Sequence, residues 1–465
     1  MLCGDFFGWE SGAWQADAVV GNPPFIRYQR FSGEQRRLAL GRASSQGVEL
    51  SALCSSWAPF VVHAASMLRK GGRLAMVLPF EVSHARYARP VLQYLTAAFG
   101  EVTFLTFRER MFRGLSEETL LVLADQKGGG STKLLWRELA DVGELPALSD
   151  RERPPRIPGV SSLDHEALCT GAERLVAYVL PPGVRDLYEQ LRELPEVRPL
   201  GQVADAGVGY VSGANDYFHL SPFEAQLWQI PSQFLRRALR RGRALKGMRF
   251  TTNDWHAALP WEGAGYLLYV EPHANLPEGL IRYLQEGERL GIPEAYKCRT
   301  RNPWYSVPHV RVPDAFLSYM SGSVPKLVAN WTRAVASNNL HRVHLRSDSG
   351  LTREALAALW QTSLTWLSAE IEGHALGGGM LKLEPREARS VLLPIAVSGN
   401  RQALADELDE VWRKHGPQEA RKLADERILK DELGLSPRAC RLLRSGAEVL
   451  MARRCHRGRN AGHAH

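Results

Sequence analysis

The stretch Asp17-Ala-Val-Val-Gly-Asn-Pro-Pro-Phe25 (DAVVGNPPF) decides how the first part of this chain folds. DAVVG has the apolar composition of a short buried strand, and the two prolines end it because proline has no N–H to donate to a neighbouring strand. A turn needs neither the asparagine before the prolines nor the aromatic ring after them. Residues 22–25 therefore predict a chemical site at the carboxyl end of a strand.

Strand and helix patterns alternate around this stretch as far as residue 125. Helical spacing is found in residues 56–68 and 87–99. Apolar runs typical of strands are found in residues 72–80, 101–107 and 118–125. Strands alternating with helices of this length predict βαβ units and a parallel sheet. We expect residues 1–130 to form an α/β catalytic part.

The rest of the chain divides into three parts by composition. Residues 131–184 include a Pro-rich polar stretch and are expected to form a linker or arm. Residues 185–396 contain short apolar runs, many aromatics and turn signals, which predict a mixed α/β domain. Residues 397–465 are densely charged with a helical pattern, and we expect their end to be disordered.

The overall composition is that of an ordinary globular protein with a polyanionic partner. Hydrophobic residues make up 45% and charged residues 23%, and no run approaches the roughly 20 apolar residues of a membrane span. The six cysteines are scattered, which argues against a disulfide framework or a metal site and suits the cytoplasm. The net charge of +8 favours a polyanion such as double-stranded DNA.

Asn-Pro-Pro-Phe is suited to methylating an amino group on a π system. The exocyclic nitrogen of adenine is a poor nucleophile because its lone pair is delocalised into the ring. The side-chain oxygen of Asn22 and the main-chain carbonyl of Pro23 can accept hydrogen bonds from its two hydrogens and localise that pair. Pro23 and Pro24 fix the backbone that aims the carbonyl. Phe25 offers a flat face on which a base extruded from the duplex can stack.

Basic and aromatic residues of the predicted second domain are candidates for DNA contacts. Seven Lys or Arg residues and no acidic residue lie between 236 and 249. They form either a solvated helix face or a surface along the phosphate backbone. Arg301 with Trp304 and Tyr305 suits base-edge or sugar contacts, although a buried Trp is an alternative reading. The residues that we predict to bind DNA are Arg236, Arg237, Arg240, Arg241, Arg243, Arg301, Trp304, Tyr305 and Arg333.

The segment 4–28 (GDFFGWESGAWQADAVVGNPPFIRY) resembles the γ-type N6-adenine DNA methyltransferases of restriction–modification systems, the TaqI/Eco57I-like group. The resemblance implies that Asp5 and Phe6 contact the adenine of S-adenosylmethionine and that Asn22 to Phe25 hold the target adenine. It also implies a second aromatic against the flipped base, which we place at Phe112. Four further blocks resemble the target-recognition half of the family: 207–220, 298–308, 327–344 and 377–394.

The resemblance implies an incomplete Rossmann-like class I methyltransferase sheet followed by a mixed α/β target-recognition domain. The family's Gly-rich cofactor loop of D-P-A-C-G-x-G type has no counterpart in this sequence. We therefore expect a chain truncated at its N-terminus that does not methylate alone. A separate polypeptide would supply the missing cofactor-binding unit.

The leading hypothesis from the sequence is a site-specific adenine-N6 DNA methyltransferase of a restriction–modification system. Two alternatives remain open. One is a catalytically inactive DNA-recognition protein without the cofactor loop. The other is a protein-glutamine methyltransferase, because those enzymes also use Asn-Pro-Pro-Tyr on a planar amide nitrogen, but they leave the basic second domain unexplained.

Overall fold

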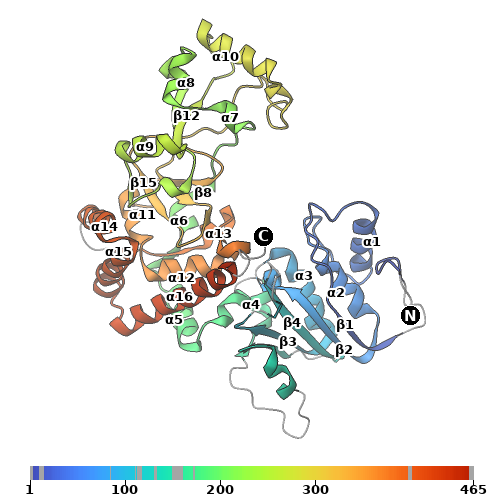
Figure 1. Ribbon diagram of the computed structural model, residues 1–465. Coiled ribbons are helices and arrows are strands. Elements are labelled where there is room, and N and C mark those ends of the chain that lie inside the picture. The colour runs from blue at the N-terminus through green and yellow to red at the C-terminus, as the bar shows by residue number, and fades with distance from the viewer. Residues whose placement is uncertain are drawn as a thin grey trace. The chain divides into compact units, whose positions relative to one another are not determined.

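A computed structural model of the protein describes residues 4–9, 15–83, 85–109, 111–112, 118–129, 133–148, 161–170, 173–395 and 401–459 (Figure 1). The chain forms two compact units. Unit 1 consists of Met1–Arg185, Leu376–Gly379 and Ala452–His465, and unit 2 of Asp186–Ala375 and Met380–Met451. Unit 1 is thus assembled from three separate segments of the chain.

Unit 1 contains a six-stranded mixed sheet in the order β1-β2-β4-β3-β5-β6. Its strands are β1 (Ala16–Gly21), β2 (Leu68–Pro79), β3 (Phe99–Phe107), β4 (Thr119–Lys127), β5 (Lys133–Leu139) and β6 (Ser161–Ser162). β1 is parallel to β2 and β3 is parallel to β5, whereas β4 is antiparallel to both of its neighbours. The prediction of a wholly parallel sheet is therefore wrong. The β3–β4 connection is shorter than the dozen or so residues that a parallel crossover needs.

The helices of unit 1 are α1 (Gly33–Ser44), α2 (Trp57–Ser66), α3 (Arg89–Ala98) and α4 (His165–Thr170), and α5 (Pro182–Arg192) leads into unit 2. Figure 1 shows α2 and α3 beside the sheet. α2 is buried on almost every face, which explains its run of apolar residues. β1 lies at the edge of the sheet with Val20 82% exposed, so the expected buried strand has only one neighbour among the described residues.

Part of the segment expected to be a linker belongs to the sheet of unit 1. β5 pairs with β3 over its full length, and its side chains Leu134, Trp136 and Leu139 are buried. Leu134 and Trp136 lie on one face, whereas the buried Arg137 and Leu139 lie on the other, so β5 is covered on both faces. The Pro-rich stretch 149–160 lies outside the described residues.

Unit 2 is built on two main sheets and two small ones. The five-stranded sheet has the order β11-β15-β13-β17-β8, and the four-stranded sheet has the order β16-β10-β12-β9. Their strands are β8 (Ala204–Val208), β9 (His219–Leu220), β10 (Leu235–Leu239), β11 (Arg249–Phe250), β12 (Ala264–Leu268), β13 (Ala315–Ser318), β15 (Leu327–Asn330), β16 (Val335–Ala336) and β17 (Leu340–Leu345). The small sheets contain β7 (Val197–Pro199), β14 (Met320–Ser321), β18 (His374–Ala375), β19 (Leu381–Lys382) and β20 (Leu392–Pro394).

Helices surround both main sheets of unit 2. They are α6 (Leu200–Val203), α7 (Asn215–Phe218), α8 (Pro222–Leu227), α9 (Thr252–Ala258), α10 (Glu278–Arg289), α11 (Arg353–Leu359), α12 (Ser363–Glu372) and α13 (Pro385–Ser390). One core is formed around Tyr217, Phe218 and Leu267, and a second around Leu317, Leu356 and Leu393. Figure 1 shows α7, α8 and α10 at one end of the unit and α11 and α12 near the other.

The charged tail continues into the core of unit 2. It forms α14 (Arg401–His415), α15 (Pro417–Ala424), a π-helix (Asp425–Glu432) and α16 (Pro437–Arg459). Leu408, Trp412 and Ile428 are buried in the same cluster as strand residues of the five-stranded sheet. A fragment that ends at residue 396 would therefore lose part of this core. The helices also carry charge on the exposed side, which is what the sequence pattern shows.

The last turns of α16 belong to unit 1. There the guanidinium group of Arg453 forms ion pairs with Glu118 and Glu138 and lies over the ring of Phe80, 5.4 Å from its centre. None of the helices in the described part of the chain combines the length and apolar character of a membrane span.

Candidate functional site

The Asn-Pro-Pro-Phe turn directly follows β1 in unit 1. Because β1 and β2 are parallel, their carboxyl ends lie at the same edge of the sheet, where α/β proteins place their ligand sites. Gly21 pairs with Met76, and a Cβ at Gly21 would lie 2.9 Å from the Met76 sulfur. A side chain at residue 21 would therefore require the flexible Met76 side chain to shift.

The polar groups of this turn are available to a ligand. The side chain of Asn22 is exposed, Pro23 is buried and the ring of Phe25 is half-buried. Among the described residues, neither the Asn22 amide nor the Pro23 carbonyl has a hydrogen-bond partner. The turn thus carries the two predicted acceptor groups next to an aromatic residue, and their role toward a target amine stays a prediction.

Ser56 holds the turn in place. Its hydroxyl donates to the Pro24 carbonyl and accepts a hydrogen bond of 2.9 Å from the Ile26 amide. The Ser56 amide in turn donates to the Ile26 carbonyl at 3.0 Å. These three bonds attach the backbone after Asn22 to the residue that precedes α2.

A second contact links this region to the end of β2. The Ser55 hydroxyl donates to Glu81, at 3.4 Å, and Glu81 lies two residues after β2 ends. The indole N–H of Trp57 donates to the Tyr87 hydroxyl at 3.0 Å. Burial, together with the charge of Glu81, raises the pKa of Tyr87, so this hydroxyl stays protonated. The buried start of α2 is therefore held by polar contacts on both sides.

Asp5 and Phe6, the predicted cofactor residues, lie in a short turn near α1 and α2. One carboxylate oxygen of Asp5 accepts from the amides of Phe7 and Gly8, at 2.8 and 3.3 Å, and the other accepts from Gln35 at 3.1 Å. Phe6 stacks on Phe60 with ring centres 3.9 Å apart. Asp5 is exposed, and the oxygen that accepts from Gln35 keeps a lone pair for a further donor. Their assignment to the cofactor stays a prediction.

Phe112, the predicted second aromatic, is 37% exposed. It precedes residues 113–117, which lie outside the described part of the chain. Its role against a flipped base stays a prediction.

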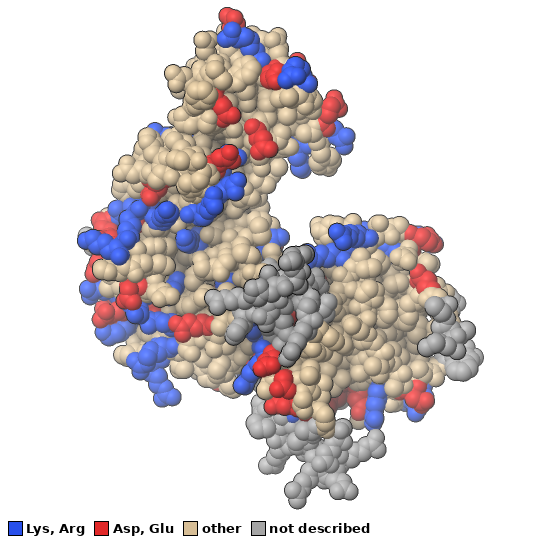
Figure 2. Space-filling view, viewed as in Figure 1, with Lys and Arg blue, Asp and Glu red and all other residues tan. Residues whose placement is uncertain are grey.

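The arginine run of unit 2 forms a strand and a turn. Arg236 and Arg237 lie on β10, where successive side chains point to opposite faces. Each of three arginines lies over an aromatic ring within about 6 Å of its centre: Arg236 over Tyr269, Arg237 over Trp255 and Arg243 over Trp261. Figure 2 shows a band of basic side chains across unit 2, at about the level of β15 in Figure 1. The run therefore supplies charge on more than one face.

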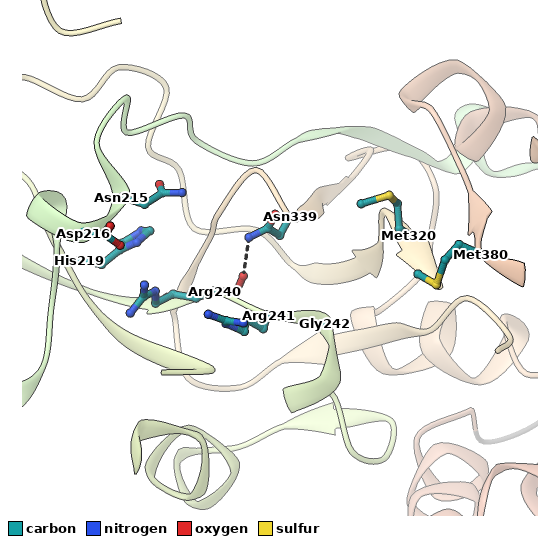
Figure 3. Close-up of a pocket in the computed structure, with 9 residues that line it drawn as sticks. All are labelled: Asn215, Asp216, His219, Arg240, Arg241, Gly242, Met320, Asn339 and Met380. Atoms are coloured by element: carbon teal, nitrogen blue, oxygen red, sulfur yellow. Dashed lines mark hydrogen bonds between the residues drawn. The ribbon is translucent and has the colours of Figure 1, made fainter. Parts of the chain in front are cut away.

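Arg240 and Arg241 line a pocket of about 590 Å³ in unit 2 (Figure 3). Its other lining residues are Asn215, Asp216, His219, Gly242, Met320, Asn339 and Met380. Both guanidinium groups approach Glu262, at 3.7 and 4.0 Å, and the pocket combines cationic, amide and carboxylate groups.

His219 is an uncharged residue in the wall of this pocket. It is only 6% exposed, and its Nε2 lies 2.7 Å from the Tyr210 hydroxyl. Burial, with the charge of Arg240 adding to it, lowers the pKa of His219 to about 3. Its other ring nitrogen, Nδ1, is buried without a hydrogen-bond partner among the described residues.

Arg301, Trp304 and Tyr305 are half-buried in the core around Tyr217 and Phe218. The Arg301 guanidinium donates to the carbonyls of Val211 and Ser212, both at 2.6 Å. Burial lowers the pKa of Arg301. These contacts favour a positioning role for Arg301, since residues 211–212 lead into the Asn215–Asp216 side of the pocket.

Arg333 is exposed in a tight turn after β15, with a φ of 58°. The buried Asn330 side chain organises this turn by donating to the carbonyls of Pro313 and Ala334, both at 2.9 Å. Arg333 is thus presented at the surface by a rigid support, and its contact with DNA stays a prediction.

Several residues at these sites were not singled out in the sequence. Ser56 precedes an apolar helical run and could have been read as a helix start, but its bonds to Pro24 and Ile26 join segments that are far apart in the chain. Asn215, Asp216 and Asn339 have no local signal, because the pocket forms only when five separate segments of unit 2 meet.

Comparisons with known proteins give a consistent result. Residues 172–429, more than half of the chain, match the family model of the C-terminal domain of the Type II methyltransferase M.Eco57I. The Type II methyltransferase M.HindII of Haemophilus influenzae is 22% identical over 225 residues, which cover 44% of this chain and 41% of that protein. The solved structure of the Type IIL restriction-modification enzyme MmeI in complex with DNA matches with a TM-score of 0.50 and 11% identity, over 94% of this chain and 57% of that one. This likeness concerns the fold, and the chain spans less than two thirds of the length of either relative.

Proposed function

The chain belongs to the family of the Type II methyltransferase M.Eco57I C-terminal domain, a family of restriction–modification DNA methyltransferases, and on that premise we propose that it takes part in transferring a methyl group to adenine N6 of double-stranded DNA. The observation that carries the proposal is the Asn22–Phe25 turn. It lies at the carboxyl end of β1, with two free acceptors beside an aromatic ring.

The turn suits the activation of an aromatic amine. The Asn22 side-chain oxygen and the Pro23 carbonyl accept hydrogen bonds from the two amino hydrogens of an adenine. Both interactions strengthen as the nitrogen gains positive charge, so they stabilise the transition state more than the ground state. Asn22 does not act as a base, and the proton leaves after the nitrogen has become cationic. Phe25 supports the extruded base from one face.

The residues of unit 1 fit S-adenosylmethionine as the methyl donor. When bound, this cofactor supplies an electrophilic methyl group on its sulfonium sulfur. Asp5 presents an exposed carboxylate with a lone pair suited to the adenine amino group of the cofactor, and Phe6 beside it is fixed by stacking on Phe60. A further polypeptide contributing to the cofactor site remains part of the proposal.

Unit 2 supplies the surface for DNA in this proposal. Its arginines lie on the strand β10 and the turn after it, and a pocket with polar walls opens beside them. Such a surface binds the phosphate backbone through several cationic contacts, and its affinity falls steeply as salt rises.

The test uses the full chain, alone and together with a polypeptide that carries the D-P-A-C-G-x-G cofactor loop, with tritiated S-adenosylmethionine and genomic DNA, followed by nucleoside analysis. In the presence of that polypeptide we expect label in N6-methyladenine, at least about a 100-fold lower rate for Asn22→Ala, and unchanged DNA affinity for that variant. Gln29→Ala is a matched control, because Gln29 carries the same amide group in an exposed position shortly after the turn.

Three outcomes would contradict the proposal. Label in methylcytosine or in protein glutamine would assign another substrate. Normal turnover in Asn22→Ala would mean that another group activates the amine. DNA binding without any methyl transfer, with or without added partner polypeptides, would favour a recognition protein over an enzyme.

A further inference from the structure

Hydrogen bonds hold the backbone of Arg240 and Arg241, the two arginines that line the pocket in unit 2. Both amides donate to the Gly263 carbonyl, at 2.8 and 3.1 Å. The Arg240 carbonyl accepts from the Ser337 hydroxyl at 3.0 Å and from the Asn339 amide at 3.1 Å, the latter drawn in Figure 3. The two guanidinium groups therefore extend from a rigid base, which limits the entropy lost when they bind a ligand.

The two arginines differ in how far they reach. The side chain of Arg240 is only 15% exposed and lies beside the buried His219, whereas that of Arg241 is 52% exposed. Glu262 lies within 4.0 Å of both and offsets part of their charge. Arg241 is thus the group that can reach a ligand at the mouth of the pocket, and Arg240 supports it from below.

The wall of the pocket also carries an acceptor. Asp216 and Asn215 lie on α7 and both are exposed, and the Asn215 side-chain oxygen accepts from the Ser212 hydroxyl, so Asp216 supplies the carboxylate that can accept from a ligand. They are held by the loop that Arg301 attaches through its bonds to Val211 and Ser212. A Cβ at Gly213, whose φ is +91°, would lie 2.8 Å from the Cβ of Lys297, so the two loops are in close contact.

The charges of this pocket fit the edge of a base pair better than a phosphate group. A phosphate would be repelled by Asp216 and Glu262. Guanine presents two acceptors, O6 and N7, in the major groove, and an arginine fork matches both. The partner cytosine presents the N4 amino group, which a carboxylate accepts. One arginine and one aspartate that line the same pocket therefore match the donor and acceptor groups of a single G·C pair.

The neutral His219 suits the same ligand. Its ring remains uncharged because it is buried beside Arg240, so it adds no further cation to the two arginines that would favour phosphate. The unpartnered Nδ1 is a further polar atom in the wall of the pocket.

We propose that this pocket reads one G·C base pair of the DNA target, with Arg241 on the O6 and N7 atoms of guanine and Asp216 on the N4 amino group of cytosine. The inference rests on the proposed function, because it assumes that DNA is the ligand of unit 2. It assigns Asp216 a role in sequence specificity. It also assigns Arg241 to a base, whereas the neighbouring arginines are proposed to contact phosphate groups.

The test is selection of bound duplexes from a library with a randomised 16-bp core, using the full chain. The variants are Arg241→Gln and Asp216→Asn. The control is Arg289→Gln, because Arg289 carries the same charge in unit 2 and pairs with Glu286 on α10 outside the pocket. The slope of log affinity against log salt is measured for each protein on one selected duplex.

We expect the wild-type motif to contain a G·C pair at which both pocket variants lose about tenfold or more of their preference, with all other positions unchanged. The control keeps the wild-type motif. Selection of an unchanged motif by both pocket variants would overturn the inference alone. An equal loss of affinity for all sequences in Arg241→Gln, with a salt slope smaller by about one, would also overturn it and assign Arg241 to phosphate. Failure of the wild-type chain to bind DNA at any salt concentration would overturn the proposed function as well.

Discussion

The hydroxyl group of Ser56 is hydrogen-bonded to the backbone carbonyl of Pro24, which lies 32 residues earlier in the chain. The same hydroxyl accepts from the amide of Ile26, so a single side chain replaces two backbone contacts that the turn cannot make for itself. Proline has no amide hydrogen, and the turn is therefore short of donors. Ser56 fixes the path of the chain immediately after Asn22 and Pro23, and with it the direction of the two proposed acceptors.

Replacing Ser56 by alanine should impair methyl transfer without affecting DNA affinity. The turn would lose both hydrogen bonds to the hydroxyl, and a shift of about 1 Å in the acceptors is enough to cost roughly 100-fold in rate. The assay is single-turnover methyl transfer beside a filter-binding titration. Ser55→Ala is the matched control, because its hydroxyl contacts Glu81 and not the turn. Equal rates in Ser56→Ala and wild type would show that the prolines alone hold the turn.

Replacing Arg301 by glutamine should relax sequence preference while leaving the salt dependence of DNA binding unchanged. Its guanidinium holds two backbone carbonyls, and losing these charge-assisted bonds should lower the free energy of unfolding by about 2–3 kcal/mol. Urea unfolding measures the stability, and duplex selection measures the preference. A salt slope smaller by about one, with stability unchanged, would instead place Arg301 on a phosphate.

Stability should depend on pH through His219. Its pKa is about 3 in the folded chain, against an ordinary value of 6.5. Between these values the unfolded state binds a proton that the folded state excludes. The free energy of unfolding therefore falls as pH decreases below about 6.5, by ~1.4 kcal/mol per pH unit from this group.

The His219→Gln variant should show a shallower pH dependence than wild type in urea unfolding between pH 4.5 and 7.5. His341 and His344 also have lowered pKa values because they are buried, so the difference between the two proteins is the informative quantity. His256→Gln is the control, because His256 is exposed on α9. Parallel curves for wild type and His219→Gln would mean that His219 binds its proton equally in the folded and the unfolded protein.

Arg413 should contribute to stability through its planar geometry. Its guanidinium group donates to both oxygens of Asp254, at 3.0 and 3.1 Å, to Asp409 at 3.1 Å and to the Arg249 carbonyl at 2.8 Å. Lysine keeps the charge but cannot form this fork, so Arg413→Lys should lower the free energy of unfolding by about 1–3 kcal/mol.

The neighbouring Lys414 provides the control for this variant. It forms an exposed pair with Glu410 on the same helix, and Lys414→Ala should change stability by less than about 0.5 kcal/mol. A similar, small effect of both variants in urea unfolding would show that α14 is held by its apolar contacts alone.

The sequence predicted the local structure of unit 1 better than its pairing. The apolar runs at 72–80 and 101–107 lie in β2 and β3, and the helical runs at 56–68 and 87–99 contain α2 and α3. These elements are specified by the spacing of their own residues. The direction of β4 and the place of β5 depend on partners elsewhere in the chain, and periodicity contains no information about them.

The candidate sites also divide into features specified by neighbouring residues and features that depend on distant parts of the chain. Asn22 to Phe25 form a continuous motif and could be found from sequence, whereas Ser56 and Asp216 act through neighbours that only the fold supplies. The arginine run shows what the sequence alone could not predict. Its charge was evident, but the alternating period of β10 and the stacking of Arg236, Arg237 and Arg243 on aromatic rings distribute that charge over different faces.

The return of α16 to unit 1 has a consequence for exchanging recognition halves between related enzymes. Arg453 pairs with Glu118 and Glu138, so unit 1 is completed by residues that follow unit 2 in the gene. An exchanged unit 2 therefore has to preserve the junctions near residues 185 and 452 and the host's own Leu376–Gly379, which also belongs to unit 1. A chimera joined near residue 185 alone would import a foreign end of α16 and lose the ion pairs of Arg453 with Glu118 and Glu138. Recombination that respects these junctions would exchange unit 2 while keeping unit 1 intact.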